Sequence, residues 1–330
     1  MELPTLKIGK LIARYPFVQG GMAVRVSTGH LAAAVAEAGG VGTIAGTGMT
    51  ADELRGEIRY ARSKTRGIIG VNVLFAVRQF ADLVKAAIAE KVDFVVSGAG
   101  FSRDMFSWGK ESGTNIVPIV SSGKLARIAT HLGAAAIVVE GAEAGGHLGT
   151  DKPIREVFPE VRQATDLPLI AAGGIANGEE AGDLFALGAQ GVQLATRFLA
   201  SEECTAAEAF KRMHLGVKEE DIVLIDSPVG MTGRAIRNPF SEALARGDLE
   251  QEVSCADCLK RCTRAYCILD ALDCARKGDV ERGVVFSGSS ATRIKDILPV
   301  REIMAQLVAG ATRRLRDISA QRDMISLEPD

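Results

Sequence analysis

Eight short apolar runs recur along the chain up to Thr196, and they constrain the fold more than any other feature of the sequence. They repeat about every 20–30 residues, which is the combined length of a strand, a helix and two loops. Runs without polar alternation are typical of strands that a parallel sheet buries on both faces. The runs are Phe17–Gly20, Val41–Ala45, Gly67–Val73, Phe94–Ser97, Ile116–Ser121, Ala136–Glu140, Pro168–Ala172 and Gly191–Thr196.

The segments between these runs carry helix signals. Ser27–Ala38 and Thr50–Ser63 each begin with a hydroxyl side chain that can cap a helix, and similar patterns cover Ala81–Glu90, Gly123–Leu132 and Gly178–Leu187. Eight strand-helix units close most naturally into a (β/α)₈ barrel, the TIM-barrel fold. An open doubly wound sheet is the alternative, although no G-x-G-x-x-G follows the first predicted strand.

The regular alternation ends after Thr196, and residues 201–295 predict an inserted, mainly helical cap after the eighth strand. This segment contains a helical pattern at Thr205–Leu215 and an apolar run at Ile222–Ile225. Val300–Arg316 has apolar residues at helical spacing and is expected to form the last barrel helix. The predicted domains are a barrel at 1–200 and 296–320, the cap at 201–295 and a polar C-terminal tail at 321–330.

The charge balance limits the classes of partner. The chain has 330 residues and a formal net charge of −2, which leaves no electrostatic footprint for nucleic acid or an anionic membrane. Neither a signal peptide nor a membrane span is recognisable, so we expect a cytoplasmic protein with a small-molecule substrate. Whether the chain forms a homodimer stays open.

Glycines and polar residues gather after the predicted strands, where the active sites of such barrels lie. The sixth run breaks into the turn EGAEAGGHLG, which carries His147 among several glycines. Glycines leave the backbone open to a ligand, and a histidine can move protons near neutral pH. This pattern indicates a reactive site around His147, although an isolated turn of this kind could be a plain surface turn.

Two of these positions indicate a phosphate site. Gly173 and Gly174 follow the seventh predicted strand, and Ala195 and Thr196 end the eighth run. The loops after strands seven and eight commonly bind phosphate in (β/α)₈ barrels. The presence of both loops together predicts a phosphate-bearing cofactor, although Gly173 and Gly174 alone could form a tight turn.

Six ordered segments of the chain resemble the nitronate monooxygenase family, formerly called the 2-nitropropane dioxygenases. The segments are PFVQGGM, LAAAVAEAGGVGTIAG, GVN, EGAEAGGHLG, PLIAAGGI and QLATRF, and GRAIRNPF adds to them. The FMN-dependent enoyl-acyl carrier protein reductases look equally similar. The resemblance implies non-covalent FMN and makes His147 the catalytic general acid/base. It places FMN against Gly21, Met22, Asn72, Gly145, Gly173, Gly174, Gln193, Leu194, Ala195 and Thr196.

Glu140 departs from the family pattern, because the monooxygenases usually have glutamine at this position. A carboxylate that faces the flavin would disfavour an anionic reduced ring. We therefore expect that Glu140, which also belongs to the predicted cofactor site, is protonated, turned away or paired with a cation such as Lys124.

The resemblance favours oxidation of alkyl nitronates with O₂. The alternative is an NAD(P)H-dependent enoyl-acyl carrier protein reductase, and a flavin-binding redox sensor without turnover is a hypothesis of another class. The missing nicotinamide fingerprint does not exclude NAD(P)H, because a nicotinamide that visits a flavin needs no Rossmann unit. A basic surface for the carrier protein could come from Arg234, Arg237, Lys260, Arg261 and Arg264.

Five of the six cysteines lie within Cys255–Cys274. Disulfides are not expected in the reducing cytosol, whereas four thiolates can hold zinc or an Fe–S cluster. Their spacing matches neither a zinc ribbon nor a ferredoxin run, and the apolar neighbours also allow a helical hairpin with buried thiols. The candidate metal ligands are Cys255, Cys258, Cys262 and Cys267, and the separate Cys204 is expected to be structural.

Overall fold

Eight parallel strands close into a barrel in the computed structural model, which describes residues 2–249 and 255–325. Each strand lies within two residues of one of the predicted runs. The (β/α)₈ prediction is confirmed, and the open sheet is excluded. In their order around the barrel the strands are β10 (Leu169–Ala172), β11 (Gly191–Leu194), β3 (Phe17–Gln19), β4 (Val41–Ala45), β5 (Ile68–Leu74), β6 (Phe94–Gly98), β7 (Asn115–Val120) and β8 (Ile137–Glu140).

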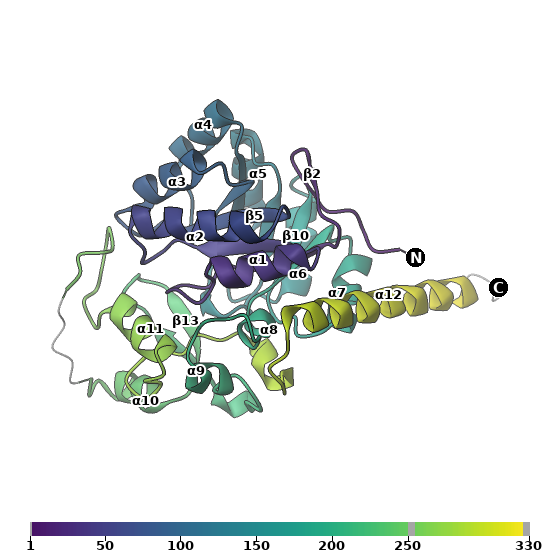
Figure 1. Ribbon diagram of the computed structural model, residues 1–330. Helices are drawn as coiled ribbons and strands as arrows, with labels where there is room; N and C mark the ends of the chain where they lie inside the picture. The colour runs from purple at the N-terminus through teal and green to yellow at the C-terminus, as the bar shows by residue number, and fades with distance from the viewer. Residues whose placement is uncertain (1, 250–254, 326–330) are drawn as a thin grey trace.

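Helices surround the barrel (Figure 1). Thr50 caps the N-terminus of α2 (Ala51–Lys64) through a capping box. The Thr50 hydroxyl accepts a hydrogen bond from the Glu53 N–H, and the Glu53 carboxylate accepts one from the Thr50 N–H. Two of the helices, α4 (Arg103–Ser112) and α6 (Ile154–Arg162), were not predicted, and α6 contains Pro159. The helices are α1 (Gly29–Glu37), α2 (Ala51–Lys64), α3 (Phe80–Ala89), α4 (Arg103–Ser112), α5 (Gly123–Leu132), α6 (Ile154–Arg162), α7 (Gly178–Ala186) and α12 (Val300–Ile325).

A hairpin of β1 (Lys7–Ile8) and β2 (Leu11–Ile12) covers one end of the barrel. Leu6 and Ile8 are buried in the same apolar cluster as the barrel-interior residue Phe94. Leu6 also lies against Gly191 at the beginning of β11. The hairpin therefore closes the N-terminal ends of the strands, and the C-terminal ends are left for a site.

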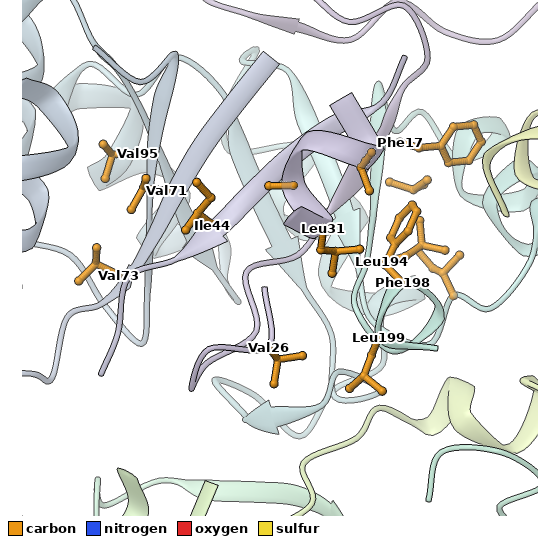
Figure 2. Packing of buried hydrophobic residues seen from close by; sticks show 14 of the residues in the cluster. Phe17, Val26, Leu31, Ile44, Val71, Val73, Val95, Leu194, Phe198 and Leu199 are labelled. Carbon is orange, nitrogen blue, oxygen red and sulfur yellow. The ribbon is translucent and has the colours of Figure 1, made fainter. Parts of the chain in front are cut away.

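The main core lies between the sheet and the helices. Figure 2 shows Phe17, Ile44 and Val71 of three barrel strands in one layer of buried side chains with Leu31 of α1. Each such side chain contributes about 1.5–3 kcal/mol when it is removed from water. This layer fixes the strands whose ends carry the site.

The cap, residues 201–295, follows β11 and the short helix α8 (Thr196–Leu199). The helix predicted at Thr205–Leu215 is shorter than expected. The segment predicted as mainly helical also holds two strands, which form a three-stranded antiparallel sheet with β9 (Gly146–His147) after barrel strand β8. Figure 1 shows α9, α10 and α11 together on one side of the barrel. The cap elements are α9 (Glu208–Arg212), β12 (Ile222–Asp226), β13 (Thr232–Ile236), α10 (Pro239–Arg246) and α11 (Ile268–Arg276).

The last helix is longer than predicted. α12 begins at Val300 as expected but continues to Ile325, so residues 321–325 of the predicted tail are helical. Residues 326–330 lie outside the described residues. The division into a barrel at 1–200 and 296–320, a cap and a tail stays a prediction. Within the described ranges, no helix combines the length and the apolarity needed to cross a membrane.

The contact between α7 and α12 gives a test of this packing. A Cβ atom at Gly178 would lie 2.5 Å from the backbone oxygen of Leu307, so we expect Gly178→Ala to lower the free energy of unfolding by about 1–3 kcal/mol. Gly56 of α2 has open space around its Cβ position, and Gly56→Ala should raise stability by about 1 kcal/mol. Urea unfolding of both variants measures the difference. Equal stability of Gly178→Ala and wild type would contradict the packing.

Candidate active site

A cavity of about 210 Å³ lies at the C-terminal ends of the barrel strands, between these ends and the cap. We call it the mouth cavity. His147 lies on its wall, together with eight of the predicted cofactor residues. These are Gly21, Met22, Asn72, Glu140, Gly145, Gln193, Ala195 and Thr196.

Three predicted cofactor residues do not line the mouth cavity. Leu194 is buried in the core between sheet and helices. Gly173 and Gly174 have left-handed φ angles of 112° and 73°, and they pack against the turn around Glu143. Their role in binding a phosphate stays a prediction.

Two polar atoms at the mouth cavity are buried without a partner. Asn72 donates a hydrogen bond from Nδ2 to the Gly21 carbonyl at 3.0 Å, but its Oδ1 accepts none. The Thr43 hydroxyl on the same wall also has no partner. A buried polar atom left unpaired costs about 1–3 kcal/mol, so both atoms favour a polar ligand. The edge of an isoalloxazine ring carries N–H and C=O groups, and these residues therefore fit FMN.

His147 is positioned by the sheet that joins the cap to the barrel. Its partner in the β9–β13 register is Gly233, and its Nε2 lies 2.7 Å from the Ser227 hydroxyl. The Phe286 ring packs edge-on against the imidazole at 5.1 Å. Burial lowers the pKa of His147 to about 4, so the imidazole is neutral at pH 7 and can accept a proton.

Ser227 and Phe286 contact His147 but were not predicted from the sequence. Ser227 lies 80 residues from His147 along the chain, in the stretch SPVGMTGR, and Phe286 lies in a later segment of the cap. No spacing rule links such distant positions to the EGAEAGGHLG turn. Only the pairing of the strands brings them to the histidine.

Glu140 lies at the end of β8, on the wall of the mouth cavity. Burial raises its pKa to about 8, which keeps the carboxyl protonated at neutral pH. Among the ion pairs of residues 2–249 and 255–325, none joins it to Lys124. Of the three expected states, the structure favours the protonated one.

The turn after β8 is held by structural hydrogen bonds. The Glu143 carboxylate accepts from the Ile154 N–H at 2.9 Å, and Arg234 donates to the Ala142 carbonyl at 2.7 Å. A Cβ atom at Gly145 would lie 2.5 Å from the Gly288 nitrogen, so close backbone approach alone requires this glycine. Arg234 is therefore committed to the turn and is not free for the predicted basic surface.

The four candidate metal ligands line a second cavity of about 210 Å³, which we call the cysteine cavity. Across the described parts of the chain, no three His, Cys, Asp or Glu side chains converge closely enough to hold a metal ion. The structure therefore does not support a site for a single zinc ion. Cys204 is buried, as expected of a structural residue.

Comparison with known proteins gives a consistent result. A family model described as nitronate monooxygenase matches residues 5–91 and 74–310. The chain is 29% identical to the (3aS,4S,5R,7aS)-5-hydroxy-7a-methyl-1-oxo-octahydro-1H-indene-4-carboxyl-CoA dehydrogenase of Mycobacterium tuberculosis, over 93% of this chain and 95% of that protein. It is similar to the structure of FabK from Thermotoga maritima, at 35% identity and a TM-score of 0.85, over 94% and 96% of the two chains. The nitroalkane oxidase of Streptomyces ansochromogenes matches at 25% identity and a TM-score of 0.79, over 93% and 98%.

The raised pKa of Glu140 predicts a pH-dependent stability. The unfolded carboxyl ionises near its ordinary pKa of 4.5, whereas the folded one keeps its proton up to about pH 8. Unfolding therefore releases a proton in this window, and the free energy of unfolding falls as pH rises, by up to about 1.4 kcal/mol per pH unit. Glu140→Gln removes this pH-dependent contribution to the free energy of unfolding.

Urea unfolding at pH 5, 6.5 and 8 measures the effect. The stability of Glu140→Gln relative to wild type should rise across the series. Glu111→Gln, at an exposed position of α4, is the control and should show a constant difference. If the free energies of unfolding of wild type and Glu140→Gln change with pH in parallel, the Glu140 carboxyl ionises normally in the folded protein.

The unpartnered hydroxyls predict which threonine contributes to cofactor binding. Thr43 and Thr28 are both buried with an unpaired Oγ1, but only Thr43 lines the mouth cavity. We expect Thr43→Val to weaken FMN binding by about tenfold, because one hydrogen bond is lost, and Thr28→Val to leave it unchanged. Quenching of FMN fluorescence by apoprotein measures both affinities. Equal affinities would remove the Thr43 hydroxyl from the FMN site.

Proposed function

This chain belongs to the nitronate monooxygenase family, and we propose that it is an FMN-dependent oxidoreductase whose substrate binds between the barrel mouth and the cap. The unpartnered Asn72 Oδ1 and Thr43 hydroxyl on the wall of the mouth cavity support FMN as the cofactor. The bound flavin would supply the electron transfer, a chemistry that the described side chains lining the mouth cavity do not provide.

His147 is the proton-transfer group of the proposal. Its neutral imidazole can accept a proton when the substrate is oxidised. When an enoyl thioester is reduced, the proton that accompanies the hydride comes from water and passes to the substrate through the imidazole. The Ser227 hydroxyl at 2.7 Å holds the ring in place. The protonated Glu140 adds a neutral hydrogen-bond donor on the same wall. Between about pH 4 and about pH 8, both titratable groups are therefore uncharged.

Our choice of substrate class rests on the lack of positively charged side chains in the mouth cavity. No lysine or arginine is among the described residues that line it. The cap contributes apolar side chains, including Phe210, Leu269 and Leu272. An anionic substrate buried against this apolar wall would find no cationic partner, whereas a neutral acyl chain is stabilised there. The FMN phosphate is a separate case, because its predicted site at Gly173 and Gly174 lies outside this lining. We therefore favour hydride transfer between the flavin and the acyl part of a thioester.

Similar proteins support this preference. The Mycobacterium tuberculosis relative is a carboxyl-CoA dehydrogenase by name, and FabK from Thermotoga maritima matches at 35% identity. The structure gives less support to the predicted basic surface for a carrier protein, because two of its five residues are engaged elsewhere. Arg234 donates to the Ala142 carbonyl, and the Lys260 ammonium donates to the Phe75 carbonyl at 2.6 Å. A CoA thioester is accordingly the first substrate to test.

Oxidation of alkyl nitronates, which the sequence analysis favoured, is the second candidate. The protonation of Glu140 supports it, because a neutral carboxyl can donate a hydrogen bond as the glutamine of the family's monooxygenases would. The two reactions differ in what reduces the flavin. NAD(P)H does so in an enoyl reductase, and the nitronate itself does so in a monooxygenase.

Anaerobic stopped-flow absorbance of the FMN-loaded enzyme separates the candidates. We expect NADH or NADPH to bleach the flavin, crotonyl-CoA to restore its colour, and propyl-2-nitronate to leave oxidised enzyme unchanged. Bleaching by the nitronate and none by NAD(P)H would establish the second candidate. Bleaching without turnover of either substrate would favour a redox sensor.

Variants test the role of His147 in whichever reaction is found. His147→Ala should lower turnover by about 100-fold or more, because it removes the proton-transfer group. Ser227→Ala should cost less and shift the pH profile of kcat, since Ser227 positions the ring. Thr28→Val, which lies away from the cavity, is the matched control. Full turnover by His147→Ala would remove this residue from the mechanism.

A further inference from the structure

The cysteine cavity is outside the mouth cavity and has no role in the proposed reaction. Its wall is formed by four of the six cysteines, spaced C-x2-C-x3-C-x4-C along the chain. Cys255, Cys258 and Cys262 lie in one loop, and Cys267 precedes the first turn of α11. One continuous stretch of chain, residues 255–267, thus brings four thiols around one space.

The arrangement of the four cysteines does not favour a single metal ion. A zinc ion needs all of its sulfurs about 2.3 Å from one centre. No three potential ligands in the described chain are gathered closely enough for one ion, yet all four cysteines face a cavity of about 210 Å³. An iron–sulfur cluster holds several irons, and each iron takes its own thiolate, so its four cysteine ligands need not converge on one ion.

The charges around the cysteine cavity complement a negatively charged cluster. Arg78, Lys260 and Arg264 lie on its wall with one acid, Asp257, which pairs with Arg78 at 3.0 Å. The Lys260 ammonium donates to the Phe75 carbonyl at 2.6 Å but keeps its positive charge beside the cavity.

The loop that carries the cysteines is fixed to the barrel. The Arg78 N–H donates to the Cys258 carbonyl and the Lys260 N–H donates to the Ala76 carbonyl, each at 2.9 Å. The Arg264 N–H donates to the Cys262 sulfur at 3.3 Å. Such N–H···S bonds stabilise cluster thiolates and tune their potential. The ligand positions are therefore held by backbone contacts.

We propose that Cys255, Cys258, Cys262 and Cys267 bind a [4Fe–4S] cluster in the cysteine cavity. Leu259 and Ile268 line both this cavity and the mouth cavity, so the cluster lies behind the wall of the proposed flavin site. The assignment rests on the cysteines alone and holds whatever the substrate of the flavin site is.

Anaerobic reconstitution of the full chain with ferrous iron and sulfide tests the proposal. We expect about four irons and four acid-labile sulfides per chain, a brown charge-transfer absorption, and an electron paramagnetic resonance signal after reduction with dithionite. Binding of one zinc per chain in competition with iron, or iron without sulfide, would overturn it. So would a protein that takes up neither metal.

Variants and alkylation identify the ligands. Cys258→Ala and Cys267→Ala should each lose iron and sulfide, whereas Cys274→Ala, outside the cavity, should retain both. If the ligand variants fold poorly, iodoacetamide labelling of the reconstituted wild-type protein gives the same answer by mass spectrometry. The four ligand thiols should be protected until the cluster is removed, and Cys274 should react throughout. Reaction of the four thiols in the loaded protein would contradict the assignment.

Discussion

The antiparallel pairing of β9 with β13 is the contact on which the site depends. It places Gly146 and His147 opposite Arg234 and Gly233, and so joins the turn after barrel strand β8 to the cap. Without this pairing the barrel mouth would lack its apolar lid, and His147 would lose Ser227 as its partner. The Arg234 side chain strengthens the same junction by donating to the Ala142 carbonyl. A two-residue strand thus couples the barrel to the cap.

Much of the fold was predictable because its signals are local. Each barrel strand is a short apolar run, since both faces of the strand are covered, and each glycine or polar residue after a strand falls at the barrel mouth by topology alone. This is why Asn72, Glu140 and His147, which lie far apart in the sequence, were correctly expected at one end of the barrel.

The rest depends on contacts between distant segments. The sheet of the cap could not be predicted, because β13 lies in a Gly-rich and Arg-rich stretch and its partner β9 is only two residues long. Ser227 is ordinary in sequence and becomes a site residue only through its 2.7 Å contact with His147. Gly145 was expected to face the flavin, and it lines the cavity, but the approach of Gly288 also requires a glycine there.

Burial gives the mouth cavity its chemical character. It raises the pKa of an acid, Glu140, and lowers that of a base, His147, so that both are neutral at pH 7. The central claim is that this uncharged cavity between barrel and cap is the FMN site. A crystal structure of the chain grown with FMN tests it most directly. We expect the flavin ring beside Asn72, Thr43 and His147. FMN bound elsewhere, with the mouth cavity empty, would contradict it.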